Sequence, residues 1–119
     1  MSSETQPTNS KSSPHAGAPL CATFDAPTHK PHFTLPAGAI DCHAHICGPA
    51  SRYEYFGGRI YTPSDALLTD YQRMLATLGI ERAVLVQPSV YGTDNSAMLD
   101  AIKCAPSKLR GVAVVDEDI

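Results

Sequence analysis

One stretch of the sequence, Ala83-Val84-Leu85-Val86, constrains the fold more than any other because it is apolar at every position. A strand with one solvated face alternates apolar and polar side chains, whereas a continuous apolar run is typical of a parallel strand covered on both faces. We therefore expect residues 82–87 to form a central strand of a parallel sheet.

Segments of strand and helix character alternate on both sides of this run. Their expected bounds are residues 39–46 (strand), 62–78 (helix), 95–105 (helix) and 109–115 (strand). Thr62 and Pro63 are typical of a helix start, and Gly79 is typical of a helix end. The order strand, helix, strand, helix, strand predicts an α/β fold with right-handed parallel crossovers.

Two architectures have this element order, namely an open doubly wound sheet and a (β/α)8 barrel. A whole barrel takes ~250 residues, and this chain has 119. If the barrel applies, the chain corresponds to its N-terminal portion, with about three β/α units.

The first part of the chain differs in composition from the rest. Residues 1–32 are rich in Ser, Pro, Thr and Ala and show no apolar periodicity. Such a segment buries too little apolar surface to offset its ordering entropy. We expect residues 1–32 to be disordered and residues 33–119 to be the folded part, with no catalytic role for His15, His29 and His32.

Charge and hydropathy exclude several function classes. The net charge is -3, and the nine basic residues are scattered, which argues against a nucleic-acid partner. No apolar run approaches the ~20 residues that span a bilayer, so no membrane association is expected. The four cysteines do not form a disulfide pattern, and we interpret them as free thiols of a cytoplasmic protein.

The clearest candidate for chemistry is the His-x-His pair, His43 and His45, at the end of the first expected strand. Side chains alternate along a strand, so both imidazoles and Asp41 should share one face, with the imidazoles ~7 Å apart. Both rings can then reach one divalent metal ion, zinc above all, or one substrate oxygen. The end of a parallel strand is also where α/β folds place their active sites.

Two other interpretations of this pair are weaker. The histidines could have no role, but buried imidazoles need polar partners and are costly to keep idle. Cys42 and Cys47 could complete a structural zinc site, but alternation points Cys42 away from both histidines.

The loop after the second expected strand is dense in hydroxyl and amide groups. It contains Ser89 and Tyr91, which suit hydrogen bonding to a polar ligand, and Asp94, which a helix cap alone would explain. In the loop after the first strand, Arg52 and Arg59 could pair with an anionic substrate, although solvated positions are their commoner role.

Three segments together resemble a known family. They are Asp41-Cys-His-Ala-His45, Arg59-Ile-Tyr-Thr-Pro63 and Gly79-Ile-Glu-Arg-Ala-Val-Leu-Val-Gln-Pro-Ser-Val-Tyr-Gly-Thr-Asp-Asn95. They resemble the amidohydrolase superfamily and, more narrowly, its 2-pyrone-4,6-dicarboxylate lactonases, over roughly residues 35–119. The resemblance implies a (β/α)8 barrel that hydrolyses the lactone ester of a small dicarboxylate, in the degradation of lignin-derived aromatics.

The resemblance also implies roles for individual residues. His43 and His45 would polarise the scissile carbonyl as catalytic residues, and Tyr61 and Ser89 would bind the substrate's carboxylates. In most of the superfamily His-x-His binds a divalent metal, whereas these lactonases work without one, so no cofactor is expected and zinc is the alternative. A later-strand Asp, a His and several Arg would complete the site, and Asp116, Glu117 and Asp118 do not match that Asp.

Three hypotheses about function remain open at this point. The first is a lactone hydrolase that acts on a small dicarboxylate. The second is a metal-dependent amidohydrolase, a decarboxylase or a sugar-acid lactonase. The third is a non-catalytic fragment, because three strands leave sheet edges and an apolar face uncovered.

Overall fold

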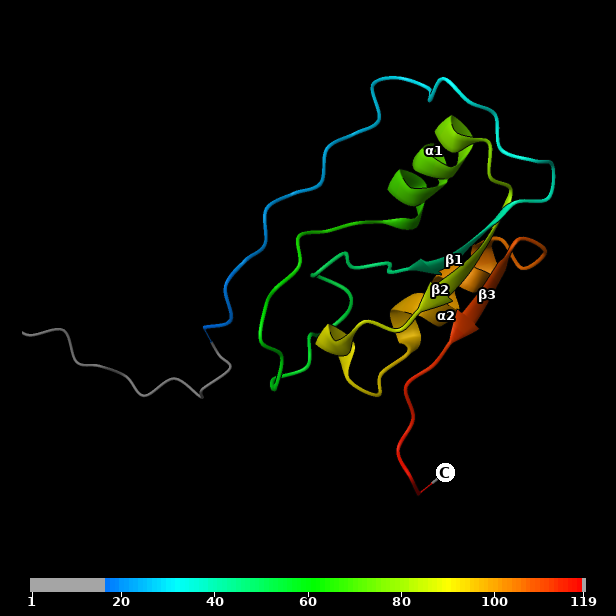
Figure 1. The fold of residues 1–119 in the computed structure, drawn as a ribbon. Helices are drawn as coiled ribbons and strands as arrows, with labels where there is room; N and C mark the ends of the chain where they lie inside the picture. Colours follow the sequence, from blue (N-terminus) through cyan, green and yellow to red (C-terminus); the bar gives the residue numbers. More distant parts are fainter. Residues whose placement is uncertain (1–16, 119) are drawn as a thin grey trace, which may run out of the picture.

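The computed structural model describes residues 17–118. Its elements are β1 (Ile40–Ala44), α1 (Leu68–Leu78), β2 (Arg82–Val86), a 3-10 turn η1 (Ser89–Tyr91), α2 (Ser96–Cys104) and β3 (Leu109–Val112). The three strands form a parallel sheet in the order β1-β2-β3 (Figure 1). The predicted alternation of strands and helices is confirmed, as is the parallel pairing.

Both helices pack on one face of this sheet. The core joins Ala83 and Leu85 of β2 and Leu109 of β3 to residues of the two helices, which are Tyr71 and Leu75 of α1 and Met98 and Ala101 of α2. Val84 and Val86 point to the other face and are only half-buried. The expectation that β2 is covered on both faces is therefore met on the helix side alone within residues 17–118.

The start of α1 corrects the sequence-based prediction. Thr62 and Pro63 were expected to begin the helix, but α1 begins at Leu68. Residues between Thr62 and Leu68 make hydrogen bonds to distant parts of the chain instead of a helix. Ala66, for example, exchanges two backbone hydrogen bonds with Cys47, at 2.8 and 2.9 Å. These tertiary hydrogen bonds outweigh the local helix-start signal. At the other end, Gly79 ends the helix as predicted, in the left-handed conformation with φ 75°.

The segment before β1 contains no helix or strand in its described part, residues 17–39, apart from one isolated bridge. Leu20 pairs with Thr62, whose N–H donates to the Pro19 carbonyl at 2.7 Å and whose hydroxyl donates to the Ala18 carbonyl at 2.9 Å. Residues 1–16, half of the segment predicted to be disordered, lie outside the described residues. The division into a disordered segment 1–32 and a folded part 33–119 therefore stays a prediction. No helix in the described part of the chain is long and apolar enough to cross a membrane.

Candidate active site

His43 and His45 lie together where β1 ends. Their ring centroids are 5.2 Å apart in an edge-to-face arrangement, and both residues are exposed. Nδ1 of His45 lies 2.8 Å from the carbonyl oxygen of Val86, the last residue of β2. A carbonyl can only accept, so Nδ1 carries a proton and Nε2 is the position left for a ligand. The predicted proximity of the two imidazoles is confirmed.

Asp41 does not lie on the same face of the sheet as the two histidines, so the prediction from simple alternation was wrong for this residue. Asp41 pairs with Ala83 and Ala44 pairs with Leu85, so Cys42 and His43 both stand opposite a single residue of β2. This β-bulge turns Asp41 toward the helices, where its carboxylate accepts a 2.6 Å hydrogen bond from the Tyr71 hydroxyl. Burial and this hydrogen bond raise the pKa of Tyr71.

The loops that follow β1 and β2 are joined by buried contacts. The Gly48 N–H donates to the Tyr91 hydroxyl at 2.7 Å, and the Phe56 N–H donates to the Val90 carbonyl at 2.6 Å. Tyr55 stacks on Tyr91 with ring centroids 5.3 Å apart. Burial raises the pKa of Tyr91, so its hydroxyl stays neutral. The two loops therefore form one packed unit at the end of the sheet where the histidines lie.

Tyr61 and Ser89 belong to these two loops. Tyr61 is half-buried against the cluster that contains Val90 and Tyr91, and Ser89 is the exposed first residue of η1. A cavity of about 350 Å³ reaches His45, but its other lining residues come from α1, the two residues before α1 and the segment around Phe24, and they include neither Tyr61 nor Ser89. The four predicted site residues thus lie at one end of the sheet without sharing one cavity, and their roles stay predictions.

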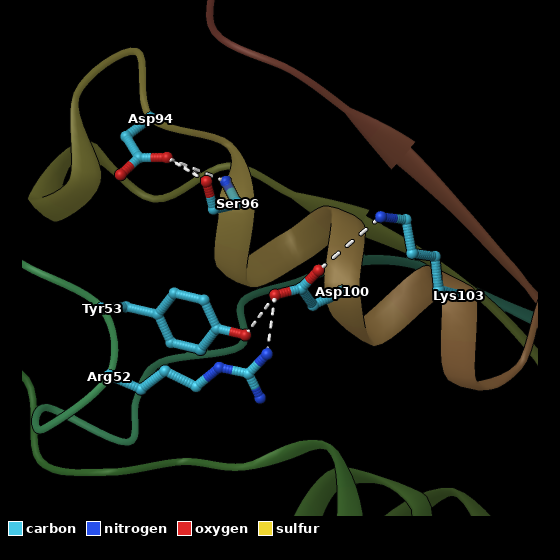
Figure 2. Close-up of polar contacts among 6 residues, drawn as sticks. All are labelled: Arg52, Tyr53, Asp94, Ser96, Asp100 and Lys103. Carbon is cyan, nitrogen blue, oxygen red and sulfur yellow. Dashed lines mark hydrogen bonds and ion pairs between the residues drawn. The ribbon is translucent and has the colours of Figure 1, made fainter.

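The two arginines considered as substrate partners are engaged within the chain. Arg59 donates to the Thr62 hydroxyl and to the Phe56 carbonyl, both at 3.1 Å. Figure 2 shows Arg52 beside Asp100 of α2, at 3.5 Å, and the adjacent Tyr53 hydroxyl bonded to the same carboxylate. This hydrogen bond raises the pKa of Tyr53. The contacts of Arg52 and Tyr53 join the loop after β1 to α2, whereas those of Arg59 lie within the loop. The Arg52 side chain is still 68% exposed, so its contact with Asp100 is a surface ion pair.

A divalent metal would find an incomplete set of ligands in the described residues. His43 and His45 can offer two imidazoles, and the Nε2 of His45 is the free ring nitrogen. Among residues 17–118 there is no group of three or more His, Cys, Asp and Glu side chains that could hold a metal ion. A zinc site needs three or four protein ligands, so residues 17–118 supply at most two of them.

Gln87 opens the polar run that follows β2, and the structure shows a role for its side chain that the run alone does not predict. It follows β2 directly, and its side chain is buried and donates two hydrogen bonds into the loop that contains Ser89. A polar residue directly after a fully apolar strand was the available signal. Its partners are backbone carbonyls several residues away, which no side-chain pattern reveals.

Comparison with known proteins decides the family. The sequence profile described as "Amidohydrolase" matches residues 40–119, which is most of the folded part. The chain belongs to the amidohydrolase family. Amidohydrolase relatives include a 2-pyrone-4,6-dicarboxylate hydrolase of Comamonas testosteroni, 44% identical over 90 residues, and a 4-sulfomuconolactone hydrolase of Rhizobium radiobacter, 41% identical over 97 residues. These matches cover 76% and 82% of this chain, but only 30% and 32% of the relatives.

Solved structures of the amidohydrolase family confirm the fold. A probable 2-pyrone-4,6-dicarboxylic acid hydrolase of Acinetobacter baumannii, with citric acid bound, matches with a TM-score of 0.61 and 37% identity. A Pseudomonas putida homologue matches with a TM-score of 0.57 and 39% identity. The matches cover 65% and 71% of this chain and 28% and 31% of those chains. The predicted (β/α)8 portion is therefore confirmed, and the chain spans about a third of its relatives' length.

Proposed function

We propose that this chain contributes the His43–His45 part of a site that hydrolyses the lactone ester of a small dicarboxylate. The observation that carries the proposal is the imidazole pair at the end of β1, with the His45 ring held by the Val86 carbonyl. The names of the relatives support the substrate class, because both are hydrolases of lactones that carry additional acidic groups. The similar Acinetobacter structure was solved with citric acid bound, a small molecule that also carries several carboxylates.

In this proposal the histidines stabilise the oxyanion that develops when water attacks the lactone carbonyl. His43 can present an N–H in its neutral form, since the structure gives its ring no hydrogen-bond partner among residues 17–118. His45 keeps one proton on Nδ1, so it donates from Nε2 only as the imidazolium. Tyr61 and Ser89 bind carboxylates of the substrate, and an Asp from a later strand of the barrel activates the water.

A chimera tests this assignment. The whole chain replaces its matching segment in the Comamonas testosteroni hydrolase, whose remaining strands supply the rest of the barrel. We expect the chimera to hydrolyse 2-pyrone-4,6-dicarboxylate and His43→Ala to lower kcat by about 10²–10³, because one oxyanion donor is lost. The isolated chain should show no turnover.

The matched control is His32→Ala, at an exposed position outside the helices and strands. Its kcat should equal that of the unsubstituted chimera. A folded chimera in which His43→Ala keeps the full kcat would refute the role of the pair.

Metal-dependent hydrolysis is a second candidate, and the free Nε2 of His45 is the observation that favours it. Elemental analysis of the chimera, together with activity before and after a chelator, separates the two candidates. The metal-free proposal predicts unchanged kcat and KM after chelation. Loss of activity that zinc restores would support the second candidate instead.

A further inference from the structure

Gln87 is a buried polar side chain at the end of the strand that leads to the candidate site. It is 5% exposed and is the one polar or charged residue in the buried core of residues 17–118. Its Nε2 lies 3.0 Å from the Gly92 carbonyl oxygen and 2.8 Å from that of Asp94. Two carbonyl acceptors require both N–H donors of the amide, which fixes its orientation.

The other end of the amide is left without a partner. Oε1 of Gln87 is buried and has no hydrogen-bond partner in the described part of the chain. Such an orphaned acceptor costs about 1–3 kcal/mol. An apolar side chain of the same size would avoid this cost. What the amide offers in return is the pair of hydrogen bonds that Nε2 donates.

Those hydrogen bonds hold the turn that presents Ser89. In the turn, the Gly92 N–H donates to the Ser89 carbonyl at 3.1 Å, and Gly92 adopts a positive φ of 55°. Nε2 of Gln87 donates to the carbonyl of the same Gly92, while the backbone N–H of Gln87 donates to the Val112 carbonyl of β3 at 2.9 Å. Gln87 thus ties the turn to the carboxyl ends of β2 and β3.

We propose that Gln87 is a positioning residue: its side-chain amide fixes the η1 turn so that the Ser89 hydroxyl meets a carboxylate of the substrate. This inference rests on the proposed function, since it acts through the carboxylate contact assigned to Ser89. It makes Gln87 responsible for substrate affinity, with no part in the attack on the carbonyl.

The test uses the chimera with Gln87→Met, which keeps the length of the side chain and removes both donors. We expect KM for the dicarboxylate to rise about tenfold, because part of a hydrogen bond to a charged group is lost. The kcat should stay within about twofold, since the reacting carbonyl is untouched. Gln72→Met, at an exposed position of α1, is the matched control and should change neither constant.

A double-mutant cycle separates positioning from general damage. If Gln87 acts through Ser89, Gln87→Met should add little to the KM of Ser89→Ala, so the two effects are not additive. Additive effects, or a fall in kcat with KM unchanged, would overturn the inference. Should Gln87→Met fail to fold, Gln87→Asn keeps an amide that is too short to reach both carbonyls, and an unchanged KM in that variant would also overturn it.

The same data distinguish the two proposals. A raised KM in Ser89→Ala with no effect of Gln87→Met refutes the positioning role and leaves the proposed function standing. A normal KM in Ser89→Ala shows that Ser89 makes no carboxylate contact and overturns the inference, whereas the proposed function is judged separately, by the kcat of His43→Ala.

Discussion

Cys47 differs from the chain's other cysteines in its surroundings. It is buried, whereas Cys21, Cys42 and Cys104 are exposed. Burial raises the pKa of the Cys47 thiol to about 11, and the charge of Asp65 adds to the shift. The thiolate is the reactive form of cysteine, so this thiol is protected both by its position and by its protonation.

Alkylation checks this protection. At mildly alkaline pH we expect iodoacetamide to modify Cys47 last among the four thiols, as measured by peptide mass spectrometry, with equal rates in urea as the control. Because folding raises the pKa of the Cys47 thiol, this group contributes to stability fully at pH values below its ordinary pKa of 9.0. The contribution is lost as the pH rises through about 11. Cys47 reacting as fast as Cys42 in the folded chain would contradict the burial.

The site residues show which single-residue features a sequence can predict. The spacing of His43 and His45 was enough to predict that their rings lie together, because strand geometry is local. The position of Asp41 was predicted wrongly, since a bulge depends on the partner strand. The proton on Nδ1 of His45 depends on a carbonyl from β2, which spacing cannot reveal.

At the scale of elements, α2 lies unusually close to β3 at Gly111. A Cβ there would lie 2.8 Å from Cδ1 of Ile102 and 3.0 Å from Sδ of Met98, both on α2. A side chain at position 111 would therefore displace the ends of these two side chains, although the backbone of Gly111 does not itself need a glycine, since its φ is not positive.

Gly111→Ala should destabilise the fold by about 1 kcal/mol, because the added methyl overpacks the α2–β3 contact while the atoms it meets belong to flexible side chains. Urea unfolding of the chimera measures this change. Gly57→Ala is the matched control, because a Cβ at Gly57 meets nothing within 4 Å. Equal midpoints for the two variants would show that the fold accommodates a methyl group at position 111 without cost.

The existence and order of the elements followed from apolar periodicity, but the start of α1 did not. Thr62 carries an ordinary helix-start signal, yet it pairs with Leu20, and Ala66 pairs with Cys47. Partners 42 and 19 residues away decide the outcome there, and they are set by how the loops pack. A cap signal reports local preference alone.

At the scale of the whole molecule, the sheet has one covered and one open face. Val112 of β3 is 52% exposed on the side away from the helices, opposite Val86 in the strand register. In a complete (β/α)8 barrel this side is the packed interior. An open apolar sheet face of this kind favours association between molecules.

We therefore expect the isolated chain to associate as its concentration rises, and Val112→Lys to weaken this association, as measured by sedimentation velocity. Leu99→Lys is the control, because Leu99 is 49% exposed on α2, away from the open face. A chain that sediments as a monomer at every concentration would contradict the expectation.

The bulge in β1 has a consequence for comparing sequences of different length. Cys42 and His43 together lie opposite Val84, so β1 has one residue more than β2 at this point of the pairing. If Cys42 were deleted, Asp41 would still pair with Ala83 and Ala44 with Leu85, and plain alternation would keep His43 on the open side. A gap of one residue at this position in an alignment is therefore compatible with the same sheet and the same pair of imidazoles.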